Sequence, residues 1–96
     1  MLSRADFIFT IGYDGPVAVV DGQAKKRYGS LSTSQLAEMN LFRAAYSSAV
    51  FSKDKDEMAL VIDAYNKKAG TAYKPADSLE RLFGVFPVEV KRAVVL

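Results

Sequence analysis

The chain has 96 residues, of which 50% are hydrophobic and 25% are charged, and its formal net charge is +2. This balance is typical of one soluble globular domain spanning residues 1–96, and it excludes a disordered chain or a strongly basic polyelectrolyte. The sequence contains neither histidine nor cysteine, which excludes disulfides, metal sites built on those residues and histidine-activated nucleophiles. No apolar run approaches the ~20 residues of a membrane span, and no signal-peptide core is found, so we expect a cytoplasmic protein.

The first third of the chain predicts three strands in a meander. Residues 7–13 are rich in aromatic and β-branched side chains and predict the first strand, and residues 17–20 predict the second. Asp21 and Gly22 then form the pair that favours a two-residue hairpin turn, which places a third strand over residues 23–28. Because this third strand carries lysines, we expect it at an edge of the sheet, where lysine discourages pairing between molecules.

Capping residues predict two long helices in the middle of the chain. Ser32, with a glutamine three positions later, is typical of a capping box and begins a helix over residues 33–51. Asp54 begins the second helix, with Glu57 as the partner in its capping box. Gly70 is suited to the left-handed conformation that the residue ending this helix adopts. The link between the helices is short, so we expect an antiparallel pair.

A third, short helix is predicted over residues 78–83, and a last strand over residues 88–96, where valines alternate with charged residues. The predicted element order is therefore β-β-β-α-α-α-β. We expect a two-layer α+β domain in which the helices cover one face of a four-stranded, mostly antiparallel sheet. Placing the last strand beside the first gives the strand order 3-2-1-4.

The predicted strands carry more apolar surface than three helices can cover, and exposed apolar patches often mark partner surfaces. One apolar residue also lies on the polar side of the second helix, and the apolar last strand is suited to strand addition. The candidate partner-binding residues are Ile8, Leu60, Val94 and Leu96. We therefore expect a small protein-interaction module that self-associates, as a homodimer for example, or docks on another protein. We expect no enzymatic activity, cofactor, metal ion or membrane partner.

The alternative is an accessory domain that binds RNA or DNA. Residues 25–28 form the only basic run, with a tyrosine that could stack on a base. Successive strand residues point to opposite faces, so this run does not make one patch, and protection of an edge strand explains it as well. The candidate nucleic-acid-binding residues are Lys25, Arg27, Tyr28, Lys91 and Arg92.

Three further patterns have simpler structural explanations. Asp54, Asp56 and Glu57 could hold a cation, but acidic residues at a helix N-terminus stabilise the helix dipole. Residues 12–15 match the spacing of a G-x-x-G loop, but they lie between predicted strands and form a turn. The serines at residues 30–34 lack a histidine base, and a lysine nearby in the sequence is the alternative base for one of them. An enzyme or small-ligand domain would need a deep pocket with converging carboxylates and a tyrosine.

Overall fold

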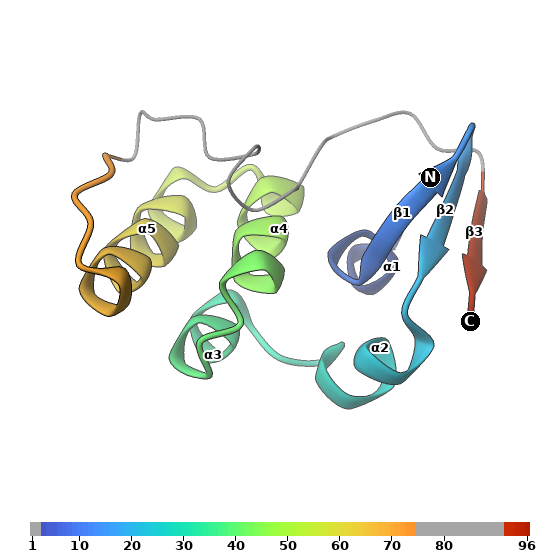
Figure 1. The fold of residues 1–96 in the computed structure, drawn as a ribbon, viewed down its shortest axis with the longest axis horizontal. Helices are drawn as coiled ribbons and strands as arrows, with labels where there is room; N and C mark the ends of the chain where they lie inside the picture. The colour runs from blue at the N-terminus through green and yellow to red at the C-terminus, as the bar shows by residue number, and fades with distance from the viewer. Residues whose placement is uncertain (1–2, 75–91) are drawn as a thin grey trace.

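The computed structural model describes residues 3–74 and 92–96, which form an α+β fold with five helices and a three-stranded mixed sheet. In chain order the elements are α1 (Arg4–Ile8), β1 (Thr10–Asp14), β2 (Val17–Val20), α2 (Gly22–Tyr28), α3 (Thr33–Glu38), α4 (Phe42–Ser52), α5 (Lys55–Ala69) and β3 (Arg92–Val95). Figure 1 shows the strands at one end of the molecule, α3, α4 and α5 at the other, and α1 between the strands and α4.

The sheet differs from the predicted one in its order and in the direction of its last strand. The strand order is β1-β2-β3, in which β2 pairs antiparallel with β1 and parallel with β3. The prediction of a four-stranded antiparallel sheet with the last strand beside the first is therefore wrong. Residues 23–28, predicted as the third strand, are helical, so the second edge of β2 is available and β3 occupies it.

The predicted first strand begins with a short helix. Ser3 is the N-cap of α1, and its hydroxyl accepts a hydrogen bond from the backbone N–H of Asp6 (3.3 Å). Extended structure begins only at Thr10, where β1 starts. Because α1 is helical, Ile8 and the residue after the helix, Phe9, turn inward and pack with Val20 of β2. Ile8 and Phe9 therefore fill a small core instead of continuing a strand.

Asp21 and Gly22 begin α2 and do not form a hairpin turn. The Asp21 carboxylate accepts hydrogen bonds from the backbone N–H groups two and three residues later, both at 3.1 Å, which is N-cap geometry. Gly22 does not have a positive φ. A Cβ at this position would instead collide with the carbonyl oxygen of Leu96. The Asp-Gly pair thus supplies a helix cap and a close approach for the end of β3.

The two long helices are predicted well at their starts and ends but not throughout. The capping box at Ser32 is present, and Asp54 and Gly70 (φ 70°) begin and end α5 as predicted. The helix predicted over residues 33–51 is instead split into α3 and α4 at Asn40, whose φ of 61° is left-handed. Asparagine tolerates this conformation better than most residues. The third helix and residues 88–91 of the last strand lie outside the described residues.

Two apolar cores of unequal size hold the described elements together. The larger core lies between α3, α4 and α5, and its buried residues are Leu36, Ala37, Ala45, Tyr46, Ala49, Val61 and Ile62. The smaller core lies between the sheet and α1, and its buried residues are Ile8, Phe9 and Val20. Tyr28 and Ala44 pack against both cores, so the sheet end and the helical end are in direct contact.

Candidate functional site

Exposed apolar side chains are concentrated on the two edge strands of the sheet. Among the described residues, the exposed large hydrophobic side chains are Ile11, Tyr13, Met39, Phe51, Leu60, Tyr73, Val94, Val95 and Leu96. Five of these nine belong to β1 or to β3 and the residue that follows it. The apolar exposure of the described chain therefore lies mainly on the sheet edges and not on the helices.

The β3 edge is formed by a short strand with one described neighbour. Val94 lies beside Val19 of β2, and Ala93 lies beside Ala18. Ala18 is buried and Ala93 packs on the smaller core, so Val19 and Val94 point to the opposite, outer face, because side chains alternate along a strand. The backbone N–H of Leu96 donates to the carbonyl of β2's last residue (3.0 Å) and extends the pairing by one residue.

The structure brings two of the four predicted partner-binding residues together. Val94 and Leu96 lie at the β3 edge and are 41% and 72% exposed. Leu60 is 42% exposed but lies on α5, at the other end of the molecule (Figure 1). Ile8 is 2% exposed and belongs to the smaller core, so a partner could not reach it in this fold.

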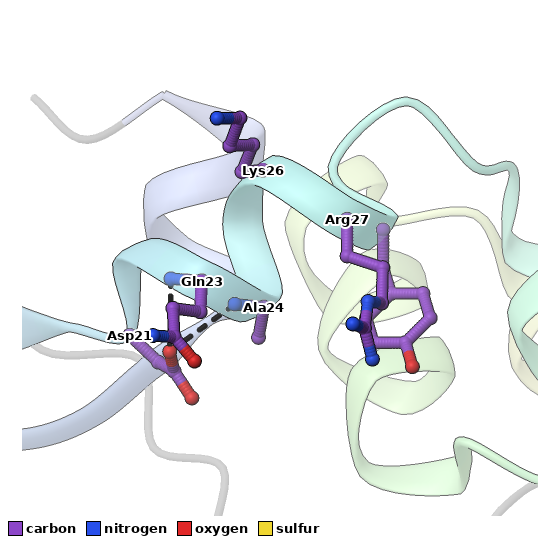
Figure 2. A pocket seen from close by; sticks show the side chains of 6 residues that line it. Asp21, Gln23, Ala24, Lys26 and Arg27 are labelled. Atoms are coloured by element: carbon purple, nitrogen blue, oxygen red, sulfur yellow. Dashed lines mark hydrogen bonds between the residues drawn. The ribbon is translucent and has the colours of Figure 1, made fainter.

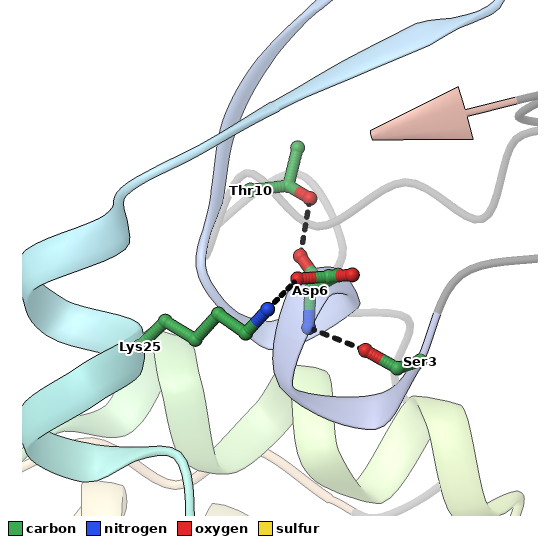
Figure 3. Close-up of polar contacts among 4 residues, drawn as sticks. All are labelled: Ser3, Asp6, Thr10 and Lys25. Atoms are coloured by element: carbon green, nitrogen blue, oxygen red, sulfur yellow. Dashed lines mark hydrogen bonds and ion pairs between the residues drawn. The ribbon is translucent and has the colours of Figure 1, made fainter. Parts of the chain in front are cut away.

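The predicted nucleic-acid-binding residues that the structure describes lie on α2 and on β3. The Lys25 ammonium lies 2.6 Å from the Asp6 carboxylate, so it joins α2 to α1 (Figure 3). The Arg27 guanidinium lies 5.9 Å from the centre of the Tyr28 ring, on α2. Arg92 is exposed on β3, and Lys91 lies outside the described residues. Because the basic run is helical, Lys25 forms an ion pair within the molecule.

A surface hollow of about 670 Å³ lies along α2. The described residues that line it are Asp21, Gln23, Ala24, Lys26, Arg27 and Tyr28. Figure 2 shows the side chains of Lys26 and Arg27 pointing in different directions from the helix. Asp21, the acidic residue of this lining, caps α2 with its carboxylate. The described lining therefore includes a tyrosine, Tyr28, but no pair of converging carboxylates for acid–base chemistry.

A chain of polar contacts links α1 to α5 through two buried hydroxyls. Arg4 Nη2 donates to Ser48 Oγ (2.8 Å), which lies 2.7 Å from Thr33 Oγ1, and Thr33 donates to the carboxylate of Glu57. Glu57 also accepts from Ser52 Oγ (2.9 Å). Thr33 and Ser48 are 4% and 2% exposed, so no substrate could reach either hydroxyl. The sequence predicted Glu57 as a local capping residue, whereas its carboxylate connects three helices.

The other edge of the sheet, β1, lies beside a groove that the sequence did not indicate. The groove has a volume of about 320 Å³; its lining includes apolar Ile8, Phe9, Leu41 and Phe42 together with exposed Asn40 and Arg43. Arg43 Nη2 donates to the carbonyl oxygen of Thr10 (2.9 Å). Burial raises the pKa of Tyr13, and the positive charge of Arg43 acts in the opposite direction. Arg43 therefore lies where the groove meets β1.

Comparisons with protein-family models, with curated proteins and with solved structures found no match to this chain. Within residues 3–74 and 92–96, no helix has the length and apolar character needed to cross a bilayer. In the same residues, no three histidine, cysteine, aspartate or glutamate side chains are grouped so that they could hold a metal ion.

Proposed function

We propose that the protein is a small interaction module that self-associates through the β3 edge of its sheet. The observation that carries this proposal is the exposure of three successive apolar residues at that edge: Val94 is 41% exposed, Val95 is 48% exposed and Leu96 is 72% exposed. An edge strand also presents backbone N–H and C=O groups that can pair with another chain. Apolar side chains, on an edge that no other described strand covers, favour the addition of a strand from a second copy.

Antiparallel pairing of two β3 strands about Val94 gives a chemically consistent interface. Val94 would face its own copy, and Ala93 would face Val95 of the other copy, so the central cross-strand pairs are apolar. The charged residue of the described strand, Arg92, would lie at opposite ends of the two strands, so like charges would not meet. A twofold arrangement of this kind closes after two copies.

The contact is small, so we expect weak association. Burying the remaining exposed part of a valine or leucine side chain is worth on the order of 1 kcal/mol. A few such residues per copy, with the strand hydrogen bonds, must offset the lost freedom of two molecules. The expected dissociation constant is on the order of 10–100 µM.

Sedimentation velocity over roughly a hundredfold range of concentration around this value tests the proposal. The wild-type chain should change from monomer to dimer. Val94→Lys should stay monomeric, because two lysines would then lie opposite each other in the pair. Leu60→Lys is the matched control: it adds the same charge at a residue of nearly equal exposure, 42% against 41%, but on α5.

Two results would contradict the proposal. In the first, the wild-type chain stays monomeric over the whole range. In the second, Leu60→Lys abolishes dimerisation while Val94→Lys does not, which would place the interface on α5. Circular dichroism of both variants, with spectra like that of the wild type, shows that any loss of association is not a loss of fold.

Binding of single-stranded nucleic acid is the second candidate function, because Lys26 and Arg27 line a hollow together with Tyr28. Fluorescence anisotropy with a labelled single-stranded RNA would measure it. If both cations contact phosphates, the slope of log K against log salt should be about −1.4, at about 0.7 per contact. The double variant Lys26→Glu/Arg27→Glu should lose this binding. Absence of binding by the wild type at low salt would eliminate the candidate.

A further inference from the structure

The two edges of the sheet differ in how regularly they pair with β2. Along β3 the register is continuous, since residues 92–95 lie in turn opposite residues 17–20 of β2. Along β1 the register shifts between Thr10 and Gly12, so no residue of β2 lies opposite Ile11, whose side chain is 57% exposed. A bulge of this kind bends and twists its strand, and proteins use such bulges to protect sheet edges from pairing with other molecules.

The carbonyl of Thr10, at the start of β1, is already bound within the molecule. One residue earlier, the carbonyl of Phe9 accepts a hydrogen bond from the backbone N–H of Asp21, which follows β2 (2.8 Å). Because successive carbonyls along an extended chain point to opposite sides, the carbonyl of Thr10 points away from β2. Nη2 of Arg43, on α4, donates to this carbonyl (2.9 Å). The guanidinium therefore occupies an acceptor that an added strand would need.

The start of β1 is also held from its other side. Thr10 is 3% exposed, and its hydroxyl donates to the carbonyl of Asp6 on α1 (2.7 Å). Movement of this residue toward an incoming strand would therefore break contacts with both α1 and α4. At the far end of the strand, Asp14 is exposed, and charged residues on an edge also oppose pairing.

We propose that the bulge at Ile11 and the hydrogen bond from Arg43 to Thr10 close the β1 edge to strand addition, so that self-association stops at two copies. If both edges accepted strands, each dimer joined at β3 would present two β1 edges and could add further dimers without limit. The limit of two copies rests on the proposed dimer, whereas closure of β1 is a property of the single chain and is measurable without it.

The variant that should open the edge combines deletion of Ile11 with Arg43→Ala. Without Ile11, the residues on either side of it become neighbours and keep their present partners on β2, so the strand pairs one residue to one. Arg43→Ala removes the donor to the Thr10 carbonyl. At concentrations roughly tenfold above the dissociation constant of the dimer, sedimentation velocity should give this variant an average mass above that of two copies, whereas the wild type stops at two.

The Val94→Lys background separates this inference from the proposed dimer. Val94→Lys alone should be monomeric, and addition of the two opening changes should give a dimer joined at β1. In ¹⁵N NMR spectra, the amide signals of residues 10–14 should then shift with concentration, and those of residues 92–96 should not. If the wild type is monomeric but this variant dimerises, the proposed dimer fails and closure of β1 stands. If the wild type dimerises and the opened variant also stops at two copies, closure of β1 fails and the dimer stands.

Two control variants separate the bulge and the hydrogen bond from lost side chains. Ile11→Ala removes the exposed isoleucine side chain but keeps the extra residue, so its association should equal that of the wild type. Lys55→Ala removes a positive charge from an exposed residue of α5 and should also have no effect. Equal association of Ile11→Ala and the deletion variant would assign the effect to the side chain and overturn the role of the bulge.

Arg43→Ala alone decides the question if the deletion does not fold, which circular dichroism would show. Arg43 is exposed, so we expect its replacement to leave the fold intact. In the Val94→Lys background this single variant should give concentration-dependent shifts at residues 10–14, smaller than those of the double variant. The absence of such shifts at millimolar concentration would overturn the proposal.

Discussion

The helical end and the sheet end of this molecule are stabilised in different ways. Among the residues that the structure describes, the core of the helical end has seven buried residues from α3, α4 and α5, whereas that of the sheet end has three. The exposed apolar side chains show the opposite distribution, since most of them lie on the sheet edges. Apolar surface buried within the chain stabilises the fold, and apolar surface left exposed is available to partners. The exposed apolar residues of the sheet end therefore support the proposed contact at the β3 edge.

The two ends are joined by polar contacts as well as by packing. Arg4, at the start of the chain, donates to the carbonyls of Gly29 (3.3 Å) and Leu31 (2.7 Å) and to Ser48 on α4. The ion pair of Lys25 with Asp6 fixes α2 against α1 (Figure 3). Several partners for one guanidinium make a stronger connection than an isolated surface ion pair, which contributes little. We therefore expect the two ends to unfold together in most conditions.

The largest expected effect compares one isoleucine from each core. Ile62 and Ile8 are both 2% exposed and both helical, so truncation to alanine makes the same chemical change in each. Ile62→Ala should lower the free energy of unfolding by about 3–5 kcal/mol, and Ile8→Ala by about 2–3 kcal/mol, because the smaller core can collapse more readily around the lost atoms. Urea denaturation measures both values. An equal or larger loss for Ile8→Ala would mean that the sheet end is packed as tightly as the helical end.

A smaller effect is expected where β3 meets α2. Gly22→Ala should cost about 1–3 kcal/mol, because the new Cβ collides with the carbonyl oxygen of Leu96. The strand should be displaced from β2, so the amide of Leu96, which donates to Val20, should lose its protection from hydrogen exchange. Gly12→Ala is the control, since no atom lies within 4 Å of a Cβ there. Unchanged protection of Leu96 in Gly22→Ala would show that α2 does not hold β3 in place.

Sequence reasoning succeeded where structure depends on neighbours in the chain. The caps at Ser32 and Asp54 and the left-handed Gly70 are local features, and all three were predicted. The Asp-Gly pair at residues 21–22 was misread because aspartate begins helices as readily as turns, and only the distant Leu96 explains the glycine. Whether a segment becomes strand or helix here is decided by contacts that the local pattern does not contain.

The candidate surfaces also differ in whether they depend on local sequence or on long-range contacts. Val94 and Leu96 were predicted because an apolar last strand is visible in the sequence. The groove was missed because it depends on contact between β1 and α4, and Arg43 is 33 residues from its acceptor Thr10. The short helix α1 likewise turns Ile8 into the core, although strand alternation had placed it on a partner surface. Long-range contacts of this kind leave no periodic signal in a single sequence.

The smallest expected effect concerns the ionisation of Tyr13, and it tests whether β1 and α4 are in contact. Burial raises the pKa of this phenol above its ordinary value of 10.0, and Arg43 partly lowers it. In Arg43→Gln the lowering influence is lost, so the pKa of Tyr13 should rise further. Difference absorbance of the phenolate, with Tyr13→Phe to assign the signal, measures this change. If the titration is unchanged in Arg43→Gln, the guanidinium does not lie near Tyr13, and the groove loses its charged end.

The same pKa shift predicts how stability depends on pH. A phenol whose folded-state pKa is raised binds its proton more tightly in the folded state than in the unfolded state. Its contribution is therefore fully present below about pH 10, the pKa of an unfolded tyrosine, and is lost as the pH rises through the folded-state pKa. Urea denaturation of the wild type on either side of pH 10 should show a small loss that is reduced in Tyr13→Phe. Because burial raises the pKa of Tyr13 and Arg43 on α4 lowers it, the loss should be larger in Arg43→Gln than in the wild type if the helical end contacts this sheet edge.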